Sequence, residues 1–362
     1  MNVRLMCMVT LALCAVGMAP AAEDADKAPA TGVSAPPPEA GEDKMNIDLV
    51  RPLDGKGGYV RLEGRDLFLT SDVNAKAQQA GFWFDVEPDP AAPALVDKSL
   101  PGAWDIAVAG DYAFLCDYTK ALFVFDLRNR QWRQAAKLDM PSMTENIVIR
   151  GKLAYIANHT AGLTIVDITD PEKPAIVGKI NPRIDCDGLA LSKDCVVLYG
   201  HHESRLVMVD VNDPAAPKQI SVYQHDKGAF NQGEVAVEGD FAYCTSVNGL
   251  VIVNITDPAN PKLVKTVELK GVNDVQVAER YAFVAAGANG IRVLDVTDPA
   301  NPVEVGRYAD RGPLAASEVA VRRVADARGN AAPSGYYLYV ANRRGPAVVM
   351  LFKPPGRQHI GP

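Results

Sequence analysis

The stretch Gly162-Leu-Thr-Ile-Val-Asp-Ile-Thr-Asp-Pro171-Glu-Lys-Pro174 decides the fold, because the chain returns to this pattern along its length. Other copies, the last two of them degenerate, lie at 81–93, 205–217, 249–261, 290–302, 121–126 and 345–354. The degenerate copies keep the apolar run but lack the complete Asp-Pro turn. Self-similar segments of this kind are the signature of a repeat architecture, so the copies predict seven structural units.

The spacing of the copies supports one continuous array. The turn prolines between Pro171 and Pro299 follow one another at intervals of 41 to 44 residues. The interval from Pro299 to Pro354 is 55 residues, which indicates an insertion in the last unit, within 324–335. A regular period of this length is typical of the four-stranded blades of a β-propeller.

Each unit has room for four strands and none for a helix. In the unit at 105–138, strands are expected at 105–109, 112–116, 122–126 and 131–138. Gly110 and Asp111 supply the tight turn between the first two strands. The inner strands are nearly continuous apolar runs, which indicates burial on both faces, as between neighbouring blades. No unit shows the 3.6-residue period of an amphipathic helix, so the fold class is all-β.

The two ends of the array are expected to join. The chain ends soon after the apolar strand that reaches Phe352, so the last unit lacks a fourth strand of its own. Ile47–Val50 precedes the first strand, at 59–62, and would pair as the outer strand of blade seven, which leaves no large gap in the ring. The sequence therefore predicts a seven-bladed β-propeller of four-stranded antiparallel blades over 44–356, followed by a tail at 357–362.

The N-terminal segment has the pattern of an export signal. Arg4 precedes an apolar run, Leu5–Met18, that is too short to span a membrane as a mature helix. Ala19-Pro20-Ala21 provides the small residues that signal peptidase accepts. We expect a signal peptide at 1–21, a flexible Ala-, Pro- and acid-rich leader at 22–43, and an extracytoplasmic mature chain, periplasmic or released, without a transmembrane segment.

The cysteines do not form a recognisable motif. Cys14 ends a lipobox-like segment, but Leu13 stands where such boxes have Gly, Ala or Ser, which disfavours lipid anchoring at Cys14. The mature cysteines show no CxxC spacing, so neither a zinc nor a redox motif is indicated. Disulfides are chemically allowed outside the cytoplasm. The sequence leaves their pairing open among Cys116, Cys186, Cys195 and Cys244.

The charge balance and the missing motifs exclude several classes of function. The formal net charge is -7, and no cluster of Lys and Arg marks a nucleic-acid face. The chain has no G-x-S-x-G elbow, no H-E-x-x-H and no P-loop. A catalytic site would therefore have to be assembled from residues on several blades.

The segments around Leu163, Leu250 and Ile291 resemble the LVIVD repeat family of bacterial extracytoplasmic propellers. They share the pattern apolar-x-Ile/Val-Val/Leu-Asp/Asn-Ile/Val-Thr-Asp-Pro, and the resemblance covers 46–354. It implies a propeller exported from a bacterial cell. It carries over no catalytic residue, because most members of the family have no assigned activity. Two units depart from the pattern because they lack the full turn.

Polar residues recur where the innermost strand of each blade begins. These strands line the central channel, so the residues are expected to form a ring, mainly of carboxylates, at its mouth. The ring comprises Asp105, Asn146, Asp187, Glu234, Asp274 and Glu318, with Tyr59 in the first unit. Carboxylate oxygens suit a hard cation such as Ca²⁺, and they also attract a basic ligand. The alternative is structural, with each carboxylate capping backbone N–H groups of a neighbouring blade.

Four of the five histidines fall on the same face, in loops of blades three to five. They are His159, His201, His202 and His225. With nearby carboxylates they could ligate a transition metal such as Zn²⁺ or supply general acid-base groups. Arg343 and Arg344 lie on this face in blade seven and could hold an anionic ligand. The alternative for all of them is a solvated loop position.

Two functions from different classes remain. The first is an exported binding or scaffold module that recognises a protein, glycan or small ligand through this face, with a protein or glycan partner at the cell envelope. The second is a metal-assisted propeller hydrolase or lyase that uses the histidines and carboxylates, with Ca²⁺ or Zn²⁺ as cofactor. The missing catalytic motifs favour binding. The two readings differ in geometry, because an enzyme needs His159, His201, His202 or His225 to converge with a carboxylate.

Overall fold

The computed structural model describes the repeat array and leaves short gaps within it. The described residues are 44–70, 81–193, 195–200, 202, 204–225, 233–309, 314–324 and 335–355. The expected signal peptide, leader and tail lie outside these residues, as do His201 and most of the expected insertion in the last unit. Within the described part of the chain, no helix has the length and apolar character needed to cross a membrane.

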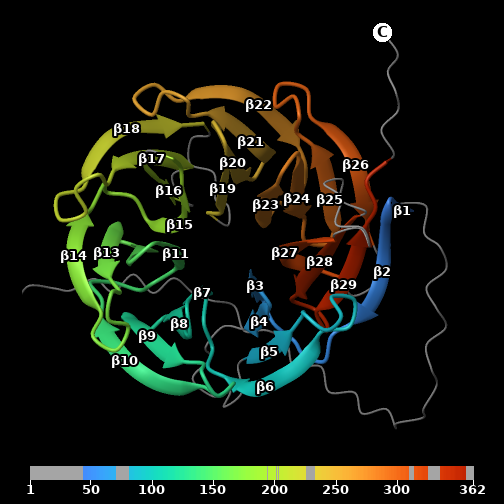
Figure 1. Ribbon diagram of the computed structural model, residues 1–362. Helices are drawn as coiled ribbons and strands as arrows, with labels where there is room; N and C mark the ends of the chain where they lie inside the picture. The colour runs from blue at the N-terminus through green and yellow to red at the C-terminus, as the bar shows by residue number, and fades with distance from the viewer. Residues whose placement is uncertain are drawn as a thin grey trace, which may run out of the picture. The chain divides into compact units, whose positions relative to one another are not determined.

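Seven antiparallel sheets follow one another as blades around a central channel (Figure 1). The strands of blades one to three, each blade from its innermost strand outward, are β3 (Tyr59–Glu63), β4 (Asp66–Thr70), β5 (Gly81–Asp85), β6 (Ala94–Leu100); β7 (Asp105–Ala109), β8 (Tyr112–Cys116), β9 (Ala121–Asp126), β10 (Arg133–Asp139); β11 (Asn146–Arg150), β12 (Leu153–Ala157), β13 (Leu163–Asp167), β14 (Ala175–Ile180).

The remaining blades continue the same order. Those of blades four to six are β15 (Cys186–Leu191), β16 (Val196–Gly200), β17 (Arg205–Asp210), β18 (Lys218–Gln224); β19 (Val235–Glu238), β20 (Phe241–Ser246), β21 (Gly249–Asn254), β22 (Lys262–Glu268); β23 (Asp274–Ala278), β24 (Tyr281–Ala285), β25 (Ile291–Asp295), β26 (Val303–Tyr308). Blade seven comprises β27 (Ala316–Val324), β28 (Gly335–Asn342), β29 (Val348–Phe352) and, from the other end of the chain, β2 (Ile47–Pro52).

The prediction of an all-β, seven-bladed propeller is confirmed. Innermost strands of neighbouring blades contact each other in chain order, and β27 contacts β3, which closes the ring. In the unit at 105–138 the first two strands have the expected bounds. The third strand begins one residue earlier, at Ala121, and the outer strand is Arg133–Asp139 instead of 131–138. The expected strand positions are therefore correct to within about two residues.

The closure prediction is also confirmed. Strand β2 pairs antiparallel with β29, and Ile47 lies opposite Phe352. A short strand that the sequence did not reveal precedes it: β1 (Lys44–Met45) pairs with the outer edge of β26 in blade six. Between the two, Asn46 has a positive φ of 57° and its side-chain amide donates to the carbonyl oxygen of Val305 at 2.7 Å. The N-terminal segment therefore ties blade six to blade seven.

The hydrophobic core lies between the blades, which explains why the inner strands are apolar on both faces. One cluster joins blades six and seven and contains Ile47, Phe283, Tyr336 and Phe352, all fully buried. Similar clusters join the other pairs of neighbouring blades. Each blade is thus stabilised by burial against two others, and removing one blade edge exposes apolar surface on its neighbour.

The four described cysteines are all buried, and none of them is joined in a disulfide. Burial raises the pKa of the Cys116 and Cys244 thiols well above the usual range of a cysteine. A protonated thiol inside an apolar sheet is a poor nucleophile, so these two residues act as small core side chains. The described blades are therefore held together without disulfides.

The Asp-Pro turns at the ends of the third strands are structural. In blade five, the carboxylate of Asp257 accepts hydrogen bonds from the backbone N–H of Ala259 at 3.0 Å and from the side-chain amide of Asn260 at 2.8 Å. Asp298 makes the same pair of contacts in blade six. These turns lie on the surface, where water also reaches the donors.

Gly290 precedes the third strand of blade six and has no room for a side chain. Its φ is 73°, and a Cβ there would lie 1.9 Å from the carbonyl oxygen of Tyr308. We expect Gly290→Ala to lower the free energy of unfolding by about 2–4 kcal/mol, from the left-handed backbone and the clash together. Urea unfolding measures this loss.

The matched control for that substitution is Gly110→Ala. Gly110 has a φ of 59°, but no atom lies within 4 Å of the position that a Cβ would take there. This variant carries only the backbone cost of about 1–2 kcal/mol. Equal losses in the two variants would show that the close approach of the Tyr308 carbonyl has no energetic weight.

Candidate functional site

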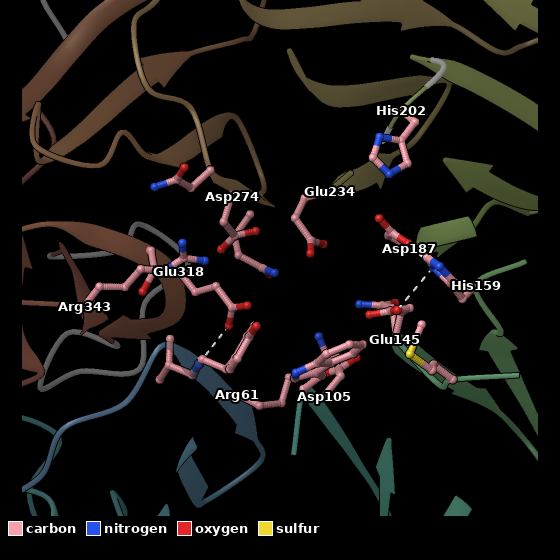
Figure 2. Close-up of a pocket in the computed structure, with 18 residues that line it drawn as sticks. Arg61, Asp105, Glu145, His159, Asp187, His202, Glu234, Asp274, Glu318 and Arg343 are labelled. Carbon is pink, nitrogen blue, oxygen red and sulfur yellow. Dashed lines mark hydrogen bonds and ion pairs between the residues drawn. The ribbon is translucent and has the colours of Figure 1, made fainter. Parts of the chain in front are cut away.

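A cavity of about 430 Å³ opens where the innermost strands begin, and all seven blades contribute to its wall (Figure 2). Each blade contributes at least one lining residue, which lies in its innermost strand or directly before that strand. These residues are Tyr59, Asp105, Asn146, Asp187, Glu234, Asp274 and Glu318. We call this cavity the channel pocket. All six residues of the expected polar ring therefore face one space.

The other residues singled out in the sequence divide into two groups. His159, His202 and Arg343 line the channel pocket. His225 does not, because its Nε2 lies 2.8 Å from the hydroxyl of Tyr199 and its ring stacks on that tyrosine. Arg344 is also absent from the pocket lining. Of the three histidines that the structure describes, His159 and His202 therefore line the pocket and His225 does not.

Three of the carboxylates do serve as caps between blades. Asp105 accepts from the backbone N–H of Ile106 at 2.8 Å and, in the next blade, from that of Ile147 at 2.9 Å. Asp274 accepts in the same way from Val319 of blade seven at 2.9 Å. Glu318 accepts from Val60 of blade one at 2.8 Å. The structural alternative is thus correct for these three positions.

Glu234 and Asp187 break that pattern. Among the described residues, the carboxyl group of Glu234 makes no hydrogen bond or ion pair, and it points into the pocket (Figure 2). Asp187 contacts the side chain of His159, with Oδ1 3.3 Å from Nδ1. Glu234 thus keeps its bonding capacity on the pocket side, whereas the caps have largely used theirs for the backbone.

Arg61 lies among the carboxylates, and nothing in the sequence singled it out because no other blade has an arginine there. Its Nη2 donates to the carbonyl oxygen of Ile147 at 3.0 Å, and its Nε lies 3.6 Å from Asp105 Oδ1 and 3.3 Å from Glu63 Oε1. Burial alone would lower the pKa of Arg61, but the surrounding carboxylates outweigh it and raise the pKa, so the guanidinium stays charged.

Burial shifts the acids of the pocket towards their neutral forms. It raises the pKa of Glu145 to about 8 and that of Asp274 to about 6. It also raises the pKa of Glu234 and Glu318 well above the usual range, with the charge of Asp274 adding to the effect. Six carboxyl groups line the pocket against two guanidinium groups, so a positive guest that replaces their protons meets an excess of carboxylates.

Glu145 was missed by the sequence analysis although it immediately precedes Asn146. Its Oε1 lies 3.4 Å from Nδ1 of His159, which in turn lies 3.3 Å from Asp187. The donor atoms of these three side chains all lie within 4.8 Å of one another. We call them the blade three–four triad. Their oxygen and nitrogen atoms are of the kind that a divalent cation takes.

An aromatic side chain and a second cavity border the pocket. Trp104 lines it and packs edge-on against Tyr118, with ring centroids 5.6 Å apart. A cavity of about 950 Å³ adjoins it, shares Tyr59 and Arg343 with it, and includes the glycine-rich segment 55–58. A ligand that fills the channel pocket can therefore extend over blade one.

The repeats are matched by one family model. The LVIVD repeat model matches residues 102–130, 141–181, 231–268 and 271–310, which lie in blades two, three, five and six. Among curated proteins, no sequence matches the chain significantly. The match identifies the repeat and assigns no residue a role.

The chain is also similar to solved structures of low sequence identity. They are the computationally designed Ika8 protein (8% identity, TM-score 0.58, 84% of this chain and 87% of that chain), the Cps50 (Swd1) β-propeller domain of Myceliophteria thermophila (10%, 0.62, 84% and 99%) and U3-55K (11%, 0.60, 85% and 98%). At these identities the likeness shows the fold alone.

Proposed function

Starting from a seven-bladed β-propeller that carries LVIVD repeats, we propose that the chain is an exported binding module whose channel pocket takes a cationic group of its ligand. The ligand class is a protein or small molecule that presents a primary ammonium or a guanidinium group. The rest of such a ligand would lie over the face that carries Trp104 and the second cavity.

The observation that carries this proposal is the excess of carboxyl groups in the pocket. The caps at Asp105, Asp274 and Glu318 have their backbone partners, whereas the carboxyl group of Glu234 has no partner among the described residues. Ionising a half-buried carboxyl that has no protein partner costs free energy, and a bound ammonium group offsets that cost through charge-assisted hydrogen bonds. Cation binding therefore gives the Glu234 carboxyl a partner that the described protein groups do not supply.

The pKa shifts give the expected pH dependence. A carboxyl group whose pKa is raised in the folded chain keeps its proton over a pH range in which the same group is ionised in the unfolded chain. Over that range, raising the pH lowers the free energy of unfolding of the ligand-free protein. For Asp274, whose pKa is raised to about 6, this occurs between its ordinary range and about pH 6. A cationic ligand favours the ionised form, so Asp274 makes the affinity rise with pH up to about pH 6, and the raised pKa values of Glu234 and Glu318 extend the rise to higher pH.

The alternative, a metal-assisted hydrolase or lyase, has the support of one of the three described histidines. His225 is engaged with Tyr199, and His202 Nε2 lies 3.9 Å from Asp185 Oδ2. His159, by contrast, lies within 3.5 Å of two carboxylates. His159 therefore meets the geometric requirement of the metal-assisted alternative, and among the described residues no second histidine joins its cluster. The binding reading needs no further group.

Glu234→Gln tests the proposal, because it removes the unpartnered charge with little change in shape. We expect binding of a lysine-rich hexapeptide to weaken about 10- to 100-fold, which corresponds to one charge-assisted hydrogen bond. Fluorescence of Trp104 at the pocket wall and calorimetry give the affinity.

The control is Asp240→Asn in the same blade, in the exposed turn between β19 and β20 on the opposite face. It makes the same change in net charge and should alter the affinity less than about twofold, since surface charges far from a site are screened. If the two variants bind the peptide equally, or if the wild-type chain does not bind it, the pocket is not a cation site.

A further inference from the structure

We infer that Glu145, His159 and Asp187 form a binding site for one divalent transition-metal ion of the Zn²⁺ class, on the wall of the channel pocket between blades three and four. This goes beyond the proposed function, which rests on Glu234 and on the excess of acids that remains when Glu145 and Asp187 are left out. The three side chains come from three different strands or loops and meet at one edge of the cavity (Figure 2).

The spacing of the donor atoms fits a single ion. His159 Nδ1 lies 3.4 Å from Glu145 Oε1 and 3.3 Å from Asp187 Oδ1. Two donors that each lie about 2.0–2.1 Å from a tetrahedral ion are about 3.3–3.4 Å apart. The side chains are 15 to 20% exposed, so an ion would be partly shielded yet reachable from the cavity. Pocket water would supply the remaining coordination.

The donor set selects the class of ion. Ca²⁺ and Mg²⁺ prefer oxygen ligands in sets of six or more, and this triad offers two carboxylates and an imidazole. An imidazole nitrogen with carboxylates suits zinc and its first-row neighbours. Two carboxylates and a neutral imidazole carry two negative charges, which one divalent ion neutralises.

The backbone at His159 gives an independent reason to look for a role of its side chain. His159 has a φ of 42°, in the left-handed region that disfavours residues with a Cβ. Blade six builds the equivalent loop with Gly287, at a φ of 55°. Both residues form an isolated bridge to the start of the next blade, to Cys186 and to Ala316 respectively. The loop therefore folds with glycine, and blade three nevertheless has a histidine.

The position of Asp187 is likewise a departure from the repeat. Blades four and seven both have a β-bulge at the start of the innermost strand, with Asp187 and Ser317 as the extra residues. In blade seven the next residue, Glu318, caps the neighbouring blade. In blade four the next residue is Gly188, where a Cβ would lie 2.0 Å from the carbonyl oxygen of Gly233. The acid of blade four thus stands on the bulge, where it meets His159.

The other explanation for this cluster is a protonated His159 held between two carboxylates. That arrangement would need no metal and would give the same 3.3 and 3.4 Å separations. It differs from a metal site in its response to added ions. Metal titration of the full chain after dialysis against a chelator therefore decides between them.

The experiment follows Co²⁺ by its visible absorption and displaces it with Zn²⁺ under competition. We expect one ion per chain in the wild type. The Zn²⁺ affinity of His159→Gly should be at least about 100-fold lower, because losing a metal ligand weakens binding no less than losing a residue that hydrogen-bonds to a ligand. His159→Gly should keep the melting temperature, since blade six uses glycine at this place. Asp187→Asn is the second variant and should also lose the ion, while Asp240→Asn should bind as the wild type does.

Two outcomes would overturn the inference: no bound Co²⁺ in the wild type at millimolar concentration, or unchanged Zn²⁺ affinity in both His159→Gly and Asp187→Asn. Peptide binding measured on the same preparations separates this inference from the proposed function. Metal binding without peptide binding would refute the proposed function alone, and peptide binding without metal would refute this inference alone.

Discussion

Deleting residues 44–52 from the chain is expected to abolish cooperative folding of the propeller. Strand β2 supplies the outer strand of blade seven, and its Ile47 is fully buried against Phe283 and Phe352. Without it, the ladder of β29 loses its partner and the aromatic cluster between blades six and seven is exposed. The loss should be at least about 5 kcal/mol, comparable to the whole stability of many domains.

Circular dichroism and urea unfolding measure this loss, and two milder variants grade it. Ile47→Ala keeps the strand but removes its buried side chain, and should cost about 2–5 kcal/mol. Deleting only Lys44 and Met45 removes β1 from the edge of blade six and should cost about 1 kcal/mol or less, because these residues are largely at the surface. A 44–52 deletion that unfolds like the wild type would contradict closure through β2.

Asp105→Ala is expected to destabilise the ring by about 2–4 kcal/mol, because two buried donors lose their acceptor. Asp105 is buried and accepts from the backbone N–H groups of Ile106 and Ile147 in two adjacent blades. Truncation leaves both donors unsatisfied in the interior and removes a nearby charge from Arg61. Burial also raises the pKa of Asp105, so some of the loss is offset because an unfavourably buried carboxyl disappears.

The comparison for Asp105→Ala is Asp257→Ala, which removes the same group from a surface turn. Asp257 also accepts two hydrogen bonds, but water replaces it there, so the expected loss is about 1 kcal/mol or less. Chemical denaturation of the two variants side by side gives the difference. Equal losses would mean that the carboxylates of the channel pocket do not join the blades.

Much of the fold was accessible from the sequence, for a physical reason. The repeated apolar strand and Asp-Pro turn fix the period, and a missing fourth strand in the last unit leaves one partner, the segment at Ile47. Strand β1 was not accessible, because two residues on a sheet edge have no pattern of their own. The bounds of strands moved by one or two residues where loops compete with the ladder.

The candidate site was only partly accessible. Repetition singled out the polar ring, because a position that recurs in every blade stands out against its neighbours. Arg61 and Glu145 do not recur, so they carried no such signal, although both are central to the charge of the pocket. His225 shows the opposite error: its loop position suggested the common face, but a side chain's direction is set by tertiary contacts, here with Tyr199.

The central claim is that the channel pocket holds protons that a cationic ligand expels. Calorimetry of the lysine-rich hexapeptide at about pH 7, in buffers of different ionisation enthalpy, counts the protons released per peptide bound. Because burial raises the pKa of Glu234 and of Glu318 well above the usual range of a glutamate, we predict net proton release and an affinity that rises from about pH 6 to about pH 8. Binding without proton release, or an affinity that falls with rising pH, would contradict the account.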